Sequence, residues 1–198
     1  MQLTERIRVE PEPTKGSRFI ATAVPVADED AAKAALAQLR AEMPDATHHC
    51  SAWRIAAPSL ERANDDGEPG GSAGRPILSA IQGRNLVNVA VIVTRYFGGT
   101  KLGVGGLVRA YGAAAAAVLD AAGTEPYVPK VELSIVHGYA DGGDVERALA
   151  EAGAHQRTVD YGTDVRREVE IATDRVEPLR AELRDATRGR ARVERKDR

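Results

Sequence analysis

The sequence predicts an α+β protein of two domains, and three observations support this fold class. In the first part of the chain, strand patterns alternate with helical patterns around one strongly apolar segment, Leu86–Tyr96. The segment Thr124–Pro129 then carries two prolines, which are typical of an extended connection. The remaining chain shows the order β-α-β-β-α-β over about seventy residues, which is the ferredoxin-like arrangement. We therefore expect one domain over residues 1–124 and a ferredoxin-like domain over residues 130–198.

Local patterns place the elements of the first domain. Apolar or alternating runs predict the strands Glu5–Val9, Ser17–Val24, Thr47–Ala57 and Leu86–Tyr96. The last of these should be central, because its middle is apolar on both faces. Helical spacing, with Asp28 and Gly123 as caps, predicts helices over residues 29–43, 76–83 and 104–122. Residues 58–74 are expected to form a glycine-rich loop.

The second domain follows the same rules. Alternating apolar residues predict the strands Val131–His137, His155–Tyr161, Val165–Thr173 and Ala191–Glu194. The middle two should form a hairpin across Gly162. One helix is expected over Val145–Ala152, and a second is marked by apolar residues at Val176, Leu179 and Leu183.

Composition and charge limit the classes of function. The chain has 198 residues, of which 43% are hydrophobic and 28% charged, as is ordinary for a globular protein. The net charge of −2 argues against a general attraction to nucleic acid, so such binding would need a local basic patch. The single cysteine, Cys50, cannot form an intrachain disulfide and fits a reducing compartment. Because no signal peptide or membrane-spanning run is visible, we expect a cytoplasmic protein with no membrane partner.

Two glycine-rich loops, Gly70–Gly74 and Gly98–Gly106, each lead into an expected helix. The N–H groups of a helix's first turn lack partners and attract anions. We therefore predict a nucleic-acid or anion-binding face made of Arg75, Arg95, Lys101, Arg109, Gly98, Gly99, Gly103 and Gly105. The alternative is that the glycines only permit positive φ and close packing of helix on strand.

Neither loop completes a nucleotide-binding signature. Gly98 and Gly103 have the Walker A spacing, but Val104 stands where the lysine is required. The dinucleotide signature also fails, because Val108 takes the position of its third glycine. We expect no cofactor.

The acidic loop Asp65–Glu68 and the pair His48 and Cys50 are the candidates for metal binding or catalysis. Clustered carboxylates can bind Mg²⁺ or act as acid and base, but they can equally make a turn and cap amides. The full EF-hand spacing is missing. His48 and Cys50 share one face of their strand, yet no CxxC or HxxxH pattern accompanies them. We expect no metal site and assign no catalytic residue.

The C-terminal stretch Arg184–Arg198 is strongly basic. It holds seven basic and three acidic residues, a net charge of +4. Such tails are often only solvated, but this one accompanies a predicted helix and strand. A nucleic-acid contact is therefore a second interpretation.

Motifs in one order along nearly the whole chain resemble the IMPACT family, in its bacterial YigZ-like branch with an extra C-terminal domain. They are Lys15–Ala21, Ala46, His48 and Cys50, Asp65–Pro69, Gly71–Pro76, Asn88–Val89, Val93–Gly112, Asp160–Val165 and Ala186–Ala191. The family-motif residues that we single out are Asp65, Asp66, Gly67, Glu68, Pro69, His48, Cys50, Tyr96 and Tyr111. Asn64 departs from the pattern, because a serine is common at that position.

The resemblance implies a first domain like domain IV of elongation factor G and a second like its ferredoxin-like domain V. Eukaryotic relatives regulate translation by competing for the ribosome-associated activator of a starvation kinase. Bacteria lack that pathway, so only the connection to ribosomes carries over. We therefore expect a translation-linked protein that binds RNA or a ribosomal surface.

Two alternatives stay open. The first is a protein-binding regulator without RNA contact, for which Tyr96 and Phe97 would be natural anchors if exposed. The second is an enzyme for an acidic or phosphorylated metabolite, which would use the acidic loop or the His48 and Cys50 pair.

Overall fold

The computed structural model describes residues 1–196, and the chain divides into two compact units. Unit 1 is Met1–Tyr127, and unit 2 begins at Val128. Both units combine helices with antiparallel sheets, which confirms the predicted α+β class. No helix within residues 1–196 is long and apolar enough to cross a membrane.

Unit 1 is built on a five-stranded antiparallel sheet with the order β2-β3-β6-β4-β5. Its strands are β2 (Ile7–Val9), β3 (Arg18–Pro25), β6 (Val89–Tyr96), β4 (His48–Ile55) and β5 (Leu60–Asn64). Strand β6 is central and buried over all but its last residue, as its apolar sequence predicted. A separate two-stranded sheet pairs β1 (Gln2–Leu3) with β7 (Thr124–Glu125). The segment Thr124–Pro129, predicted as an extended connection, therefore begins with a short strand.

Strand β5 was not predicted, because residues 58–74 were assigned to a loop. The strand pairs only with β4, at the edge of the sheet, and four of its five residues are exposed. An exposed edge strand has no buried face, so its sequence lacks the apolar alternation on which the prediction depends.

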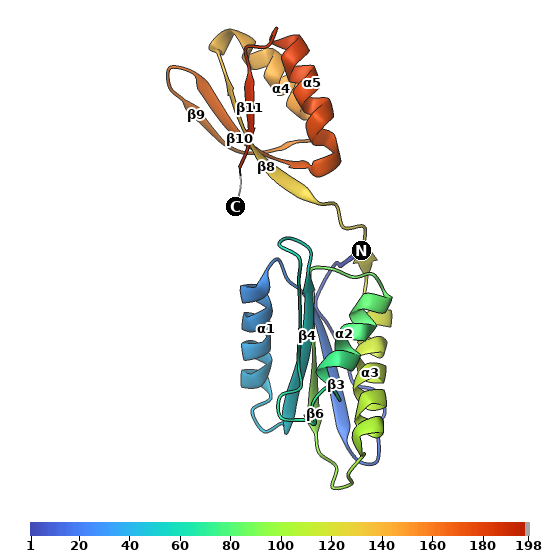
Figure 1. Ribbon diagram of the computed structural model, residues 1–198. Coiled ribbons are helices and arrows are strands. Elements are labelled where there is room, and N and C mark those ends of the chain that lie inside the picture. Colours follow the sequence, from blue (N-terminus) through green and yellow to red (C-terminus); the bar gives the residue numbers. More distant parts are fainter. Residues whose placement is uncertain (197–198) are drawn as a thin grey trace. The chain divides into compact units, whose positions relative to one another are not determined.

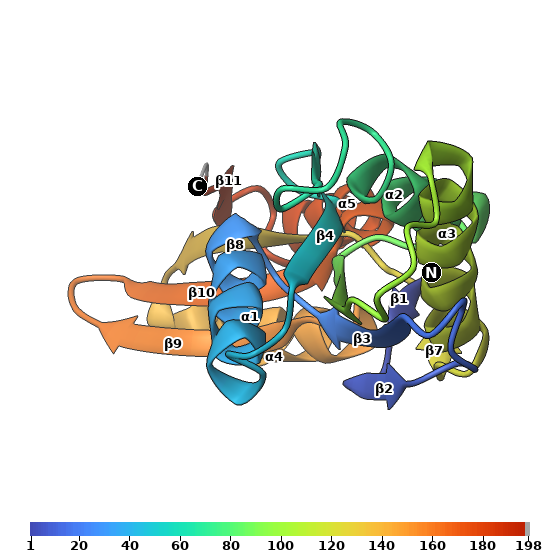
Figure 2. The same cartoon turned by 90° about the horizontal axis from the view of Figure 1, so that it is seen from below.

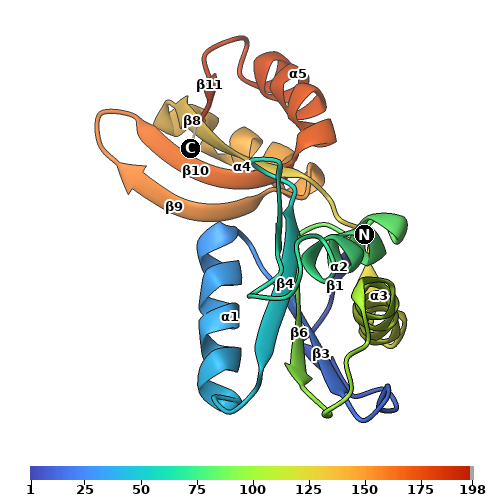
Figure 3. The same ribbon diagram turned by 60° about the horizontal axis from the view of Figure 1, so that its bottom comes forward.

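Three helices cover the two faces of this sheet. Helix α1 (Glu29–Glu42) lies on one face, and α2 (Gly74–Gly83) and α3 (Val104–Asp120) lie on the other (Figures 1 and 3). The Asp28 carboxylate caps α1 by accepting the Ala31 N–H at 2.8 Å, as predicted. Unit 1 is therefore a three-layer domain.

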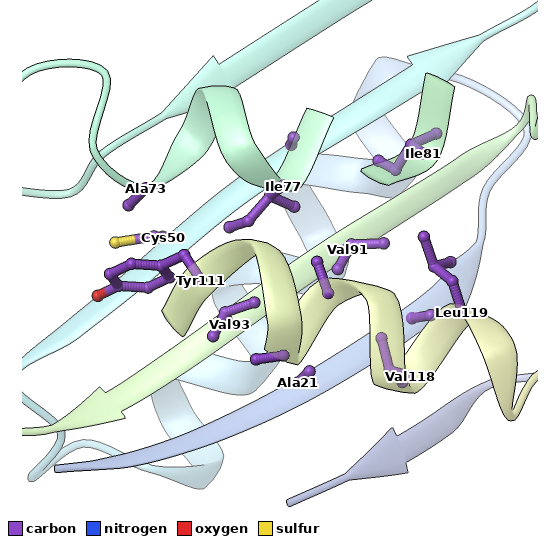
Figure 4. Close-up of a cluster of buried hydrophobic side chains, with 14 of the residues drawn as sticks. Ala21, Cys50, Ala73, Ile77, Ile81, Val91, Val93, Tyr111, Val118 and Leu119 are labelled. Carbon is purple, nitrogen blue, oxygen red and sulfur yellow. The ribbon is translucent and has the colours of Figure 1, made fainter. Parts of the chain in front are cut away.

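The core lies in two layers, one on each face of the sheet. The layer under α2 and α3 consists mainly of small aliphatic side chains, with the fully buried Tyr111 as its largest member (Figure 4). The layer under α1 contains Trp53 and Leu39. Because Ala110, Ala114 and Ala115 face the sheet, α3 can pack closely on it.

Unit 2 has a four-stranded antiparallel sheet with the order β11-β8-β10-β9. Its strands are β8 (Lys130–His137), β9 (His155–Tyr161), β10 (Val165–Ala172) and β11 (Arg192–Arg195). Its helices are α4 (Gly142–Glu151) and α5 (Val176–Ala186), each preceded by one 3-10 turn, Tyr139–Asp141 and Thr173–Arg175. Strands β9 and β10 form the long hairpin seen in Figure 2. The chain order confirms the ferredoxin-like prediction.

Candidate functional site

The predicted loops of unit 1 are joined to one another through backbone contacts and hydrogen bonds. The connection between β2 and β3 touches the loop between β6 and α3, where a Cβ added to Gly98 would lie 1.9 Å from the Gly16 carbonyl carbon. The Gly98 N–H also donates to Ser17 Oγ at 3.2 Å. A glycine is therefore required at position 98 so that the two backbones can approach closely. This agrees with the alternative interpretation of the sequence, in which the glycines permit close packing.

In the first glycine-rich loop, the backbone amides bind the carboxylate of Asp65, a side chain of the same domain. The Asp65 carboxylate accepts the N–H groups of Gly71, Ala73 and Gly74 at 2.7, 2.9 and 2.8 Å. Burial acts to raise the pKa of Asp65, but the three amide hydrogen bonds, together with the Arg75 charge, outweigh it and hold the pKa below its usual value. The expected external anion site at Gly70–Gly74 is thus occupied by Asp65.

Asp66 also acts within the fold. Its Oδ1 forms an ion pair with Arg40 at 2.6 Å, and its Oδ2 accepts the His49 N–H at 2.6 Å. Asp66 and Gly67 both have positive φ, at 45° and 88°, so they form the turn that the structural alternative predicted.

Glu68 and Arg95 form a buried ion pair between the β5–α2 loop and β6. Glu68 Oε1 accepts from Arg95 Nη1 at 2.5 Å and from the Tyr111 hydroxyl at 2.7 Å. Arg95 also donates to Ser17 Oγ at 3.2 Å and is 5% exposed. We had expected Arg95 on the binding face, and this expectation is corrected. Its guanidinium is inside the domain, where a carboxylate neutralises it.

Cys50 is fully buried, and its surroundings do not favour a nucleophile. Its S–H donates to the Asp65 carbonyl oxygen at 3.0 Å, and Figure 4 shows the thiol in the core beside Ala73 and Tyr111. Burial raises the pKa of Cys50 to about 12, so the thiol stays protonated at neutral pH. His48 Nδ1 lies 2.7 Å from the Asp66 carbonyl oxygen. Within residues 1–196, no group of three potential metal-ligating side chains occurs.

The basic side chains of unit 1 fall into two classes. Nine of its thirteen Lys and Arg residues form ion pairs with carboxylates, namely Arg6, Arg8, Arg18, Lys33, Arg40, Arg54, Arg62, Arg84 and Arg95. The other four form no ion pair with any residue in 1–196, and all are exposed. They are Lys15, Arg75, Lys101 and Arg109, which we call the basic end. The basic-patch prediction did not include Lys15, although it lies in the first family motif.

The basic end is associated with the start of α3. Lys15 precedes Gly16, which contacts the loop that holds Lys101. Arg109 Nη1 would lie 3.6 Å from a Cβ on Gly105, so this guanidinium is next to the first turn of α3. Arg75 belongs to α2, which packs on α3 where Pro76 meets Gly112. Three of the predicted basic residues are therefore exposed on these joined elements.

The N-terminus of α3 differs from those of α1 and α2. Asp28 caps α1, and Asp65 accepts amides at the start of α2. In α3, the N-cap is Gly103 with φ 72°, no side chain caps the helix, and the first turn holds no acidic residue. The first-turn amides of α3 are therefore left for an external acceptor.

Unit 2 holds a cavity of about 360 Å³ on its sheet. The lining residues are Ser134, Val136, Thr163, Asp164, Arg166, Arg192 and Glu194, which include none of the site residues singled out from the sequence. Within the basic C-terminal stretch, Arg190 pairs with Asp141 and Lys196 with Glu168. Arg184 pairs with Asp185. Arg188, Arg192 and Arg195 form no ion pair with residues 1–196, and Arg198 lies outside the described residues.

Sequence comparison finds two families along the chain. The Impact N-terminal domain matches residues 15–119, and a domain of unknown function, DUF1949, matches residues 135–190. The IMPACT family member YigZ of Escherichia coli (strain K12) is 36% identical over 181 residues, covering 90% of this chain and 89% of YigZ. YvyE of Bacillus subtilis (strain 168) is 34% identical over 181 residues, covering 89% of this chain and 82% of YvyE.

A more distant relative and a solved structure agree with this result. The protein described as an IMPACT homolog of Saccharomyces cerevisiae is 38% identical over 100 residues, covering 48% of this chain and 38% of the yeast protein. A crystal structure of a hypothetical protein matches with a TM-score of 0.76 and 33% identity, covering 98% of this chain and 96% of that one.

Proposed function

The chain belongs to the IMPACT family, and from this premise we propose that it is a translation-linked regulatory protein whose basic end binds RNA, free or on a ribosomal surface. The observation that carries the proposal is the set of four exposed cations that form no ion pair within residues 1–196, Lys15, Arg75, Lys101 and Arg109. Of these, Arg75 still interacts with the Asp65 carboxylate at longer range and helps to lower the pKa of Asp65. Phosphate groups are the ligands that such unpaired cations and free helix amides favour.

The charge balance around the basic end supports an anionic ligand. The carboxylates of Asp65, Asp66 and Glu68 are all engaged by amides or by arginines inside unit 1. Asp65 offsets part of the Arg75 charge, whereas none of these carboxylates forms an ion pair with Lys15, Lys101 or Arg109. A chain with a net charge of −2 can in this way present a locally positive surface.

A protein partner is the second candidate, and one observation favours it. Val104 and Val108 of α3 are 58% and 39% exposed, and they stand one helical turn apart beside the cations. A partner with acidic and apolar side chains would cover both features. Its binding would be less sensitive to salt than that of RNA.

Co-sedimentation with ribosomes and isolated subunits tests the proposal. It compares wild type with the double variant Lys101→Ala/Arg109→Ala at low and moderate salt, with and without nuclease. Each lost phosphate contact should lower the slope of log affinity against log salt by about 0.7, so the double variant should lose about 1.4. Its affinity should fall to a similar extent for every RNA sequence.

The matched control is Lys33→Ala/Arg62→Ala, which removes the same charge from two cations of unit 1 that already pair with Glu29. This control should bind like wild type. The proposal fails if wild type does not sediment with ribosomes or subunits at any salt. It also fails if the two double variants behave alike.

A further inference from the structure

We infer that the basic end takes unpaired RNA and that the Phe97 ring stacks on one of its nucleobases. The inference rests on the proposed function and adds the form of RNA that is bound. Phe97 begins the loop between β6 and α3, and its side chain is 47% exposed. Its loop also carries Lys101, a cation without an ion pair within residues 1–196, so one segment offers both an aromatic face and a positive charge.

The Phe97 ring is the outer member of a column that starts in the core. Tyr111 packs edge-on against Phe19, with ring centroids 5.1 Å apart and an interplanar angle of 86°. The Arg95 guanidinium carbon lies 5.5 Å from the Phe19 centroid and 5.5 Å from the Phe97 centroid. Arg95 therefore supports Phe97 from the protein side by a cation–π contact, and a planar group stacked on the exposed part of Phe97 would extend the column.

Other contacts fix the inner members of the column and the backbone that carries Phe97. Glu68 and Ser17 hold the Arg95 guanidinium, at 2.5 and 3.2 Å. The Phe97 N–H donates to Thr47 Oγ1 at 3.0 Å, and the next residue, Gly98, packs against Gly16. Binding would therefore cost little conformational entropy in the backbone at Phe97. In this arrangement the buried Arg95 is a positioning residue for the exposed ring.

The neighbouring charges favour a nucleobase over an aromatic side chain. Lys101 follows Phe97 in the same loop, and Lys15 lies in the connection that contacts it. Cations that bind phosphates beside an exposed aromatic ring are the common pattern of single-strand binding. In a duplex the bases are already stacked and paired, so Phe97 could contact only an unpaired nucleotide.

Fluorescence anisotropy with a labelled twelve-nucleotide RNA, single-stranded or annealed to its complement, tests the inference in the full-length protein. We expect wild type to bind the single strand more tightly than the duplex. Phe97→Leu, which keeps an apolar side chain but removes the ring, should weaken single-strand binding about fivefold or more and leave duplex binding unchanged. The matched control is Tyr161→Leu, which removes an exposed ring of unit 2 and should have no effect.

A second variant, Phe97→Trp, keeps a stacking ring and gives a direct signal. Its indole fluorescence should be quenched by the single strand and not by the duplex, whereas the native Trp53 is buried in the core and should respond to neither. Thermal unfolding of each variant checks that the fold is intact.

The outcomes separate this inference from the proposed function. Equal, salt-sensitive binding of both RNA forms, unaffected by Phe97→Leu, would overturn the inference and leave RNA binding standing. No binding of either form would remove both. Ribosome binding that survives nuclease treatment and is lost in Phe97→Leu would overturn the inference in favour of a protein partner.

Discussion

At the residue scale, the contact between Glu68 and Arg95 explains why several motif residues occur together. The ion pair is almost fully buried, and Tyr111 and Ser17 supply further hydrogen bonds to it. Removing one partner of such a pair leaves an uncompensated charge in the interior. The motif residues Glu68 and Tyr111 are therefore explained by the fold, without assigning them a reaction.

We predict that Glu68→Gln destabilises unit 1 by about 3–5 kcal/mol, because the Arg95 charge would remain buried without its partner. Urea unfolding followed by Trp53 fluorescence measures the change. The matched control is Glu10→Gln, which breaks an exposed pair with Arg18 and should cost about 0–1 kcal/mol. Equal effects of the two variants would show that the buried pair has no special role.

Residue positions at the site were only partly predictable from the sequence. Arg75, Lys101 and Arg109 are exposed, whereas Arg95 is not. An arginine at the end of a strand gives no sign of burial when its partner, Glu68, is 27 residues away in the chain. Only the fold brings such a pair together, so residue type and local spacing cannot distinguish an internal cation from a surface one.

At the element scale, Asp65 works as the N-terminal anchor of α2. The pKa of Asp65 lies below its usual value of 3.8, although burial alone would raise it, because three amides bind the ionised form and the Arg75 charge favours it. For a lowered folded-state pKa, the stabilisation is present above the unfolded pKa. It is lost as the pH falls through the folded value.

Asp65→Asn should therefore lower the free energy of unfolding by about 1–2 kcal/mol at neutral pH and by less once the pH is below the folded pKa of Asp65. Urea unfolding of both proteins at pH 7 and in acid checks this. Asp30→Asn is the control, because its carboxylate is 94% exposed in the first turn of α1. A stability difference for Asp65→Asn that is the same at both pH values would contradict the anchoring role of the carboxylate.

Helices and strands were predictable where their burial produces a recognisable apolar pattern in the sequence. Strand β6 is apolar on both faces and was predicted as the central strand, and the β8 to β11 region has the expected order. The edge strand β5 and the two-residue strands β1 and β7 were missed. The pairing of β1 with β7 joins residues distant in the chain, whereas β5 forms a hairpin with β4, and all three strands bury too little to leave a periodic pattern.

At the scale of the whole molecule, each unit has a core of its own. The core of unit 2 is formed by its sheet and its two helices, with Leu133, Ile135, Leu179 and Leu183 almost completely buried. Trp53, the single tryptophan of the chain, is in the core of unit 1. Tryptophan fluorescence therefore reports on unit 1 alone, whereas far-ultraviolet circular dichroism reports on both units.

We predict that the two units unfold separately, because separate cores make separate cooperative transitions. Leu133→Ala in unit 2 should lower the free energy of unfolding of unit 2 by about 2–5 kcal/mol, because it leaves a cavity. It should shift the unfolding of unit 2 that circular dichroism detects and leave the Trp53 fluorescence transition unchanged. Ile77→Ala is the matched change in unit 1, where the side chain is also fully buried, and it should shift the Trp53 transition. If Leu133→Ala shifted the fluorescence and dichroism transitions together, the chain would unfold as one cooperative body.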